Sequence, residues 1–224
     1  MARTGSATTS PATSPGDAGA LPSRLLGPAP SPAGTALGEA GSRQTRHLAF
    51  VFTDVVDSSS LYYRLGDEAA SEIMRAHLDW LNDLVQRFGG VVIKTMGDGA
   101  MAAFEDAQAA VAAALALQQE IRAFAQSVGE PWLALRIGVH TGPCVVTRTG
   151  ATVDCFGTTV NLAARLLRAS QGGDVVISRT AARDAGVPVL PASHACEPAE
   201  LALGEAAVIE ILRVAPRREA ALVH

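Results

Sequence analysis

The sequence predicts an α+β fold in which helices pack on a mostly antiparallel sheet. Two features lead to this class. Short apolar runs come in pairs joined by turn residues, as in hairpins, and two long amphipathic patterns lie between the pairs. Strand and helix do not alternate strictly, so a parallel sheet is not indicated. The 224 residues suffice for one domain with a full core and leave little room for a second.

Periodicity and turn residues predict the individual elements. A nearly continuous apolar run at 47–52 is typical of a strand covered on both faces. Apolar residues spaced by three or four predict helices over 61–88 and 106–128, and a further helix is expected over 158–169. The other predicted strands are 91–95, 100–104, 132–140, 144–148, 175–177 and 207–214, with turns at 97–99 and 141–143.

The chain divides into three predicted segments. Residues 1–45 are rich in Ala, Pro, Ser, Thr and Gly and have few side chains to bury, so we expect a disordered N-terminal arm. Residues 46–215 form the predicted domain, and 216–224 form a short tail. The arm lacks the apolar run of a signal peptide, and the most apolar stretch, 109–117, is far shorter than the roughly 20 residues of a membrane span. We therefore expect a cytoplasmic protein that does not bind a membrane.

Charge and cysteine content exclude further classes. The net charge of -4 supplies no broad positive field, so a nucleic-acid partner is not expected. The three cysteines, Cys144, Cys155 and Cys196, follow no disulfide or metal-ligand spacing. We interpret them as reduced thiols in a cytosolic protein.

Two aspartates lie where strands meet turns. Asp54 follows a buried strand, and Asp98 lies at the tip of a predicted hairpin. Two carboxylates from neighbouring strands can converge on Mg²⁺, which proteins hold with one or two carboxylates together with substrate phosphates. Taken singly, each aspartate has a simpler explanation, since Asp54 could cap the next helix and Asp98 could shape a turn.

Four motifs in one order resemble the class III nucleotidyl cyclases. Phe52-Thr-Asp-Val-Val-Asp-Ser58 and Lys94-Thr-Met-Gly-Asp-Gly99 look like the two metal-binding signatures of that family. Arg136-Ile-Gly-Val-His-Thr-Gly142 is similar to its strand-turn landmark, and Asp154-Cys-Phe-Gly-Thr-Thr-Val-Asn-Leu-Ala-Ala-Arg165 to its base-reading and transition-state segment. The resemblance spans about 47–214 and implies a ferredoxin-like cyclase catalytic domain that acts as a homodimer.

The resemblance implies a two-metal site at the aspartates. Asp54, Asp98 and the main-chain carbonyl of Val55 would bind two Mg²⁺ or Mn²⁺ ions, one activating the ribose 3′-hydroxyl and the other neutralising the triphosphate. Ser58 and Ser59 directly precede the first predicted helix, at whose start main-chain N–H groups can bind phosphate oxygens. Simple helix capping explains these serines equally well.

The resemblance also implies a second set of residues, contributed by the partner subunit. Asn161 and Arg165 lie four residues apart on a predicted helix and so share a face. Asn161 would orient the ribose, and Arg165 would stabilise the charge that develops on the α-phosphate. Lys94 and Asp154 fall where the family reads the purine, and a lysine donor beside a carboxylate acceptor matches the Watson–Crick edge of adenine rather than guanine. A surface arginine, a helix-start asparagine and a strand-edge lysine are the simpler alternatives.

Three further residues affect this interpretation. Asp57 stands where many family members have glycine, which adds a negative charge near the expected triphosphate path unless it caps the helix and points away. Leu203 stands where relatives have lysine, so one cationic contact is missing. His140 is expected to form a local hydrogen bond at a strand end rather than to bind a metal or transfer protons.

The sequence as a whole predicts an adenylyl cyclase that converts ATP to cyclic AMP and pyrophosphate at a homodimer interface. A guanylyl cyclase is the first alternative, and Asp154 argues against it. The second alternative is a catalytically silent nucleotide-binding or dimerisation module. Such a module would usually lack a metal aspartate or the Asn–Arg pair, and all six positions are filled here.

Overall fold

One sheet and five helices make up the part of the chain that the structure describes. The computed structural model describes residues 42–149, 152–186, 194–204 and 207–216. The strands are β1 (Ser42–Val55), β2 (Val91–Met96), β3 (Gly99–Phe104), β4 (Leu135–Thr149), β5 (Thr152–Phe156), β6 (Asp174–Ser178), β7 (His194–Ala202) and β8 (Val208–Pro216). The helices are α2 (Ser58–Leu65), α3 (Asp67–Arg87), α4 (Ala107–Ser127), α5 (Thr158–Ala169) and α6 (Arg179–Asp184).

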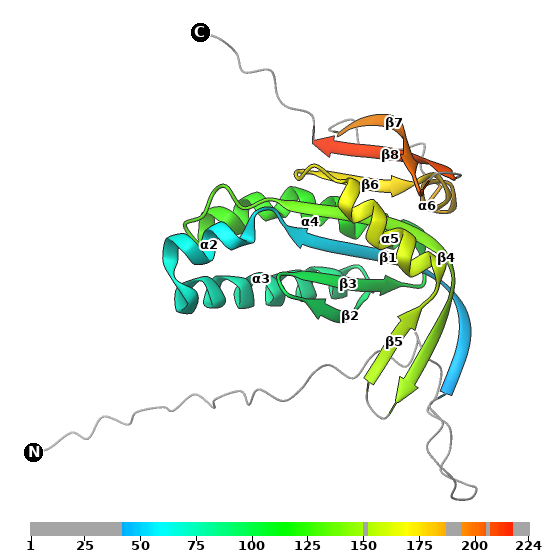
Figure 1. The fold of residues 1–224 in the computed structure, drawn as a ribbon, viewed down its shortest axis with the longest axis horizontal. Coiled ribbons are helices and arrows are strands. Elements are labelled where there is room, and N and C mark those ends of the chain that lie inside the picture. Colours follow the sequence, from blue (N-terminus) through cyan, green and yellow to red (C-terminus); the bar gives the residue numbers. More distant parts are fainter. Residues whose placement is uncertain (1–41, 150–151, 187–193, 205–206, 217–224) are drawn as a thin grey trace, which may run out of the picture. The chain divides into compact units, whose positions relative to one another are not determined.

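The sheet confirms the predicted α+β class. Its strand order is β2-β3-β1-β4-β6-β8-β7, and β5 pairs with β4 (Figure 1). Every described pair is antiparallel except β4 and β6. β1 begins at Ser42, four residues before the expected start of the domain, because its first residues pair with the end of β4. Residues 1–41 of the predicted arm lie outside the described residues, as do residues 217–224 of the predicted tail.

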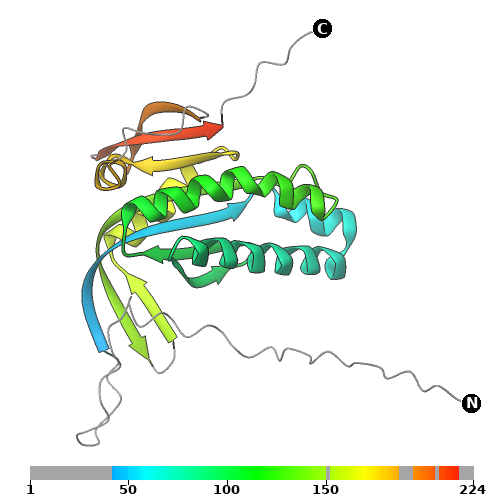
Figure 2. The same cartoon turned by 180° about the vertical axis from the view of Figure 1, so that it is seen from behind.

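Helices cover both faces of the sheet, which explains the apolar run at its centre. Figures 1 and 2 show α5 on one face and α3 and α4 on the other. β6 is buried throughout, because Val175 and Ile177 join the core under α3 and α4 while Val176 packs against α5. In β1, residues 48–52 are at most 4% exposed. The predicted two-sided burial of this strand is confirmed.

The predicted helix over 61–88 is wrong in one respect, since it is two helices. α2 ends at Leu65 and α3 begins at Asp67, with Gly66 between them. Gly66 has a φ of 80°, a left-handed value that side chains disfavour. The apolar spacing continues across this break, and periodicity therefore did not reveal it.

The predicted turn at 141–143 is also wrong, because β4 runs through it without interruption. Gly142 and Pro143 pair with Leu48 and His47 of β1. A Cβ atom on Gly142 would meet the hydroxyl of Thr159 at 2.8 Å, and that hydroxyl donates to the Pro143 carbonyl over 2.6 Å. The glycine and proline therefore allow α5 to approach the strand, and they do not reverse the chain.

Three elements were not predicted, namely β5, α6 and β7. All are short or polar, so periodicity carries little signal there.

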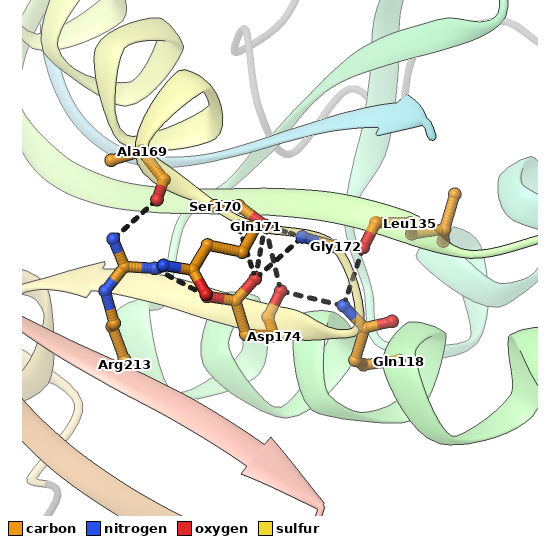
Figure 3. Close-up of polar contacts among 8 residues, drawn as sticks. All are labelled: Gln118, Leu135, Ala169, Ser170, Gln171, Gly172, Asp174 and Arg213. Atoms are coloured by element: carbon orange, nitrogen blue, oxygen red, sulfur yellow. Dashed lines mark hydrogen bonds and ion pairs between the residues drawn. The ribbon is translucent and has the colours of Figure 1, made fainter. Parts of the chain in front are cut away.

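The loop after α5 is fixed by Asp174, whose carboxylate accepts hydrogen bonds from Gln171 N and Gly172 N at 3.0 and 3.2 Å and from Arg213 Nη1 at 2.8 Å (Figure 3). Arg213 Nη2 also donates to the Ala169 carbonyl over 2.7 Å. This network holds the C-terminal end of α5 against the sheet.

Candidate active site

Strand pairing brings Asp54 and Asp98, here called the aspartate pair, to the same end of the sheet. Asp54 is the penultimate residue of β1, and Asp98 lies in the two-residue turn between β2 and β3. β3 pairs with β1 so that Ala100 faces Thr53, whose hydroxyl accepts a hydrogen bond from Ala100 N over 3.1 Å. A Cβ atom on Gly99 would lie 2.3 Å from the Thr53 carbonyl oxygen. Only glycine therefore lets the turn approach β1 this closely.

The electrostatics show that the two carboxylates are neighbours. Burial raises the pKa of Asp54 above its ordinary value, and the charge of Asp98 raises this pKa further. Arg136 opposes the shift, because its Nη1 donates to Asp54 Oδ2 over 3.1 Å. Oδ2 of Asp98 is buried and has no hydrogen-bond partner among the described residues. The pair therefore combines partial burial, mutual repulsion and one unsatisfied oxygen.

These properties fit a hard divalent cation. Mg²⁺ prefers oxygen ligands, and a cation would relieve both the repulsion and the unsatisfied oxygen. Within the described residues, no cluster of three His, Cys, Asp or Glu side chains could hold a metal. A cation at the aspartate pair would therefore need further oxygens, of the kind that a triphosphate supplies.

The start of α2 lies directly after the aspartate strand. Ser58 and Ser59 are the first two residues of the helix, which begins three residues before its expected start at Leu61, and Ser59 is exposed. Asp57 has a φ of 53° and is the one described residue other than glycine in the left-handed region, which explains why glycine suits this position. Its carboxylate caps no main-chain N–H and instead accepts a hydrogen bond from the Ser60 hydroxyl over 2.6 Å. Capping by Asp57, one of the expectations, is thus not observed.

Lys94 and Asp154, here called the purine pair, are brought into direct contact although 60 residues separate them. Lys94 Nζ lies 2.8 and 3.0 Å from the two carboxylate oxygens of Asp154. The Lys94 side chain is 41% exposed and that of Asp154 is 30% exposed, so a ligand can reach both. Phe156 lies beside them, with its ring centroid 5.8 Å from Lys94 Nζ and half of its surface exposed. A cationic donor, an anionic acceptor and an aromatic surface are thus grouped together.

Asn161 and Arg165, here called the helix pair, both lie on α5 and both are exposed. α5 packs closely on β4, because a Cβ atom on Gly138 would lie 2.3 Å from the main-chain nitrogen of Leu167. Arg165 Nη1 donates to the main-chain carbonyl of Leu203 over 2.7 Å. Neither residue of the helix pair forms an ion pair with a described residue.

The predicted residues thus form separate groups within one chain. No hydrogen bond or ion pair among the described residues joins the aspartate pair to the purine pair or the helix pair. Each group keeps unused hydrogen-bonding capacity.

Sequence reasoning missed the roles of two residues beside the aspartate pair. Arg136 is the first residue of the motif at 136–142, and its place opposite Asp54 follows from the β1–β4 register. His77 of α3 is 1% exposed and packs against Trp80 and Phe124. Burial lowers the pKa of His77 to about 4, and the charge and main chain of nearby Asp98 oppose this shift. No sequence pattern distinguishes His77 from its apolar neighbours.

His140 forms a hydrogen bond, but the expected local bond at a strand end is wrong, because the residue lies within β4 and its partner is 38 residues away. Its Nδ1 is 2.7 Å from the Ser178 hydroxyl on β6. Burial lowers the pKa of His140 to about 4, so the ring is neutral at neutral pH. His140 supports the sheet.

Comparison with known proteins agrees with this arrangement. Residues 41–186 match the family model of the adenylate and guanylate cyclase catalytic domain. The chain therefore belongs to the class III nucleotidyl cyclase family. An adenylate cyclase of Streptomyces coelicolor is 40% identical over 121 residues, which make up 54% of this chain and 29% of that protein. The chain thus spans less than a third of that relative.

Two solved structures show the same fold over nearly their whole length. The adenylyl cyclase CyaB from P. aeruginosa has a TM-score of 0.70 at 26% identity, covering 79% of this chain and 97% of that one. The guanylyl cyclase Cya2 has a TM-score of 0.67, also at 26% identity, covering 81% of this chain and 97% of that one. Overall similarity therefore does not decide between adenine and guanine as the base of the substrate. No helix in the described ranges is both long and apolar enough to cross a membrane.

Proposed function

We propose that this protein is an adenylyl cyclase, which converts ATP to 3′,5′-cyclic AMP and pyrophosphate. The contact between Lys94 and Asp154 carries the choice of base. Lysine can donate to N1 of adenine, and the carboxylate can accept from the N6 amino group. Guanine presents the opposite pattern on that edge, so binding it would leave both groups without a partner.

The aspartate pair binds the metal end of the substrate. Asp54, Asp98 and the Val55 carbonyl would hold two Mg²⁺ or Mn²⁺ ions, which would favour ionisation of the 3′-hydroxyl and offset the charge of the triphosphate. Arg136 keeps its guanidinium beside Asp54 and favours the ionised carboxylate that cation binding requires. Ser58 and Ser59 place main-chain N–H groups near the phosphates.

The helix pair acts on the reacting phosphate. Asn161 orients the ribose so that its 3′-oxygen faces the α-phosphorus in line with the leaving pyrophosphate. The new O–P bond forms as the bond to the β-phosphate oxygen breaks, and the 3′-hydroxyl proton leaves to solvent or to a phosphate oxygen. Arg165 must exchange its bond to the Leu203 carbonyl for the α-phosphate, where it stabilises the charge that grows in the transition state.

A homodimer supplies the complete site. In this proposal the aspartate pair of one subunit faces the purine pair and the helix pair of the other. The exposure of the helix pair supports a shared site, since neither side chain forms an ion pair with a carboxylate of the described residues. Two-fold symmetry gives two equivalent sites. We place the enzyme in the cytoplasm, where ATP and reduced cysteines such as those described here occur.

The direct test is turnover by the purified full chain. With ATP and Mn²⁺, we expect cyclic AMP and pyrophosphate in equal amounts, at a specific activity that rises with protein concentration until the dimer saturates. GTP is assayed in parallel, because the similarity to the guanylyl cyclase Cya2 makes guanylyl cyclase the second candidate. Preference for GTP would support that candidate. Absence of both cyclic nucleotides over a wide concentration range would indicate a silent module.

A further inference from the structure

A cavity of about 350 Å³ opens between α5 and the segment that ends β7. Arg165 and Arg168 line it from the helix, and residues 201–204 line the opposite side. Its volume is at the small end of the range for ligand sites in proteins. Among the described residues, the two arginines are the only charged side chains that line it. The described lining is therefore positively charged.

Arg168 has no part in the proposed function so far, and it forms no hydrogen bond or ion pair with another described residue. It lies three residues after Arg165, so both guanidinium groups project from the same side of α5. Arg165 donates to the Leu203 carbonyl, whereas Arg168 forms no hydrogen bond or ion pair within the described ranges. Two like charges that share a cavity repel each other, and an anion bound between them would remove that cost.

The described residues of the opposite wall supply no cation. Leu203 and Gly204 lie there, and both residues offer only apolar atoms and main-chain groups. The positively charged side chains that a phosphate chain would contact in the cavity are therefore both on α5. Arg168 lies one helical turn beyond Arg165, about 4.5 Å along the axis.

We propose that Arg168 binds the terminal phosphates of the substrate, next to the α-phosphate contact of Arg165. The inference rests on the proposed function, because it takes the triphosphate to lie along this side of α5. Arg168 then supplies from the helix the positive charge that Leu203 does not supply. It holds the leaving pyrophosphate in the ground state and the transition state alike, so it contributes to substrate affinity more than to the rate of the chemical step.

A purely structural role makes a different prediction. Arg168 lies in the last turn of α5, where a cation stabilises the helix by interacting with its dipole. In that case its replacement would lower thermal stability and leave phosphate affinity unchanged. Affinity for a phosphate chain therefore distinguishes the two roles.

The test is calorimetric titration of the full chain with inorganic tripolyphosphate, a probe that has no base and undergoes no cyclisation. Arg168→Gln should weaken binding about tenfold, whereas Arg168→Lys should bind within about threefold of the unsubstituted chain. Arg122→Gln is the matched control, since Arg122 is an exposed arginine of α4 without a described partner. Its affinity should stay within about twofold. With ATP as substrate, Arg168→Gln should raise KM about tenfold and change kcat less than about threefold.

Equal tripolyphosphate affinity for the unsubstituted chain and Arg168→Gln would overturn the proposal, even if the protein makes cyclic AMP. A similar loss in Arg122→Gln would also overturn it, because the effect would then come from net charge alone. Failure to cyclise ATP would contradict the proposed function and leave the tripolyphosphate result to be judged on its own. Thermal melting of each variant shows whether the fold is intact.

Discussion

The aspartate pair and the helix pair differ in how firmly the fold holds them. Asp54 and Asp98 are attached to the two strands β1 and β3, whose residues beside the site are at most 2% exposed at Thr53, Ala100 and Met101. Asn161 and Arg165 lie on the exposed side of α5, and within the described ranges the Arg165 side chain hydrogen-bonds only to the main-chain carbonyl of Leu203. One half of the proposed site is preformed by the sheet. The other half presents side chains that are free to adjust.

This difference indicates what each half needs in order to act. The aspartate pair carries mutual repulsion and an unsatisfied oxygen, and a cation would relieve both. The helix pair carries positive charge and amide groups that need an anionic ligand and, in our proposal, a facing subunit. Substitutions in the two halves should therefore fail in different ways.

The largest effect is expected at the aspartate pair. Asp54→Asn should lower cyclase activity about a thousandfold or more, since the loss of the proposed metal ligand would remove several kcal/mol of transition-state stabilisation. Because the folded state raises the pKa of Asp54, its ionised form destabilises the fold at neutral pH. Without metal, the variant should therefore melt no lower than the unsubstituted chain. Asp79→Asn, an exposed position on α3, is the control and should retain activity.

The next effect is expected at Arg165. Arg165→Ala should lower kcat about 10² to 10³-fold, as for the loss of a transition-state donor, with a smaller change in KM. Stabilisation by Mn²⁺ should persist in thermal melts, because the aspartate pair is intact. Loss of that stabilisation would contradict the separation of the two halves.

A smaller effect is expected at the purine pair. Lys94→Glu combined with Asp154→Cys replaces the cationic donor with an acceptor and removes the carboxylate acceptor. The ratio of kcat/KM for ATP to that for GTP should fall at least about tenfold, since each wrong pairing leaves a polar group unsatisfied. An unchanged ratio would show that the base is recognised elsewhere.

The smallest effect is expected at His140, which lies in neither half. Its pKa is 6.5 in the unfolded chain and about 4 in the fold, so protonation of His140 does not reduce the free energy of unfolding above pH 6.5. As the pH falls towards 4, the unfolded chain takes up a proton before the fold does, and the free energy of unfolding falls by at most about 3 kcal/mol. Urea unfolding of His140→Gln should show a weaker dependence between pH 6.5 and 4, with kcat at pH 7.5 unchanged. A parallel pH dependence would contradict the assignment.

The sequence predicted β1 and the β2–β3 hairpin well, and β4 and β7 poorly. Residues 47–52 and the hairpin at 91–104 carry strong apolar and turn patterns, and the structure has them as predicted. The error at 141–143 has a clear reason. Gly142 and Pro143 serve the contact with α5, which is a tertiary effect that no local pattern reveals. β7 alternates charged and small residues and carries no signal of burial.

For the candidate site, motifs predicted residues but not their contacts. The purine pair was proposed from two separate motifs, and the structure brings its members to 2.8 Å. The pairing of Arg136 with Asp54 needed the β1–β4 register, which a single sequence does not supply. Arg168 lies outside every motif, and only the cavity draws attention to it.

The most direct test of the composite site is complementation between two inactive variants. Asp54→Asn lacks the metal half, and Arg165→Ala lacks the helix half. Mixed in equal amounts and allowed to exchange subunits, half of the dimers are heterodimers, and each has one intact site of two. The account predicts that activity returns to about a quarter of the value for the unsubstituted protein. Activity that stays at the level of the separate variants, with subunit exchange shown by tagged chains, would contradict a site shared between subunits.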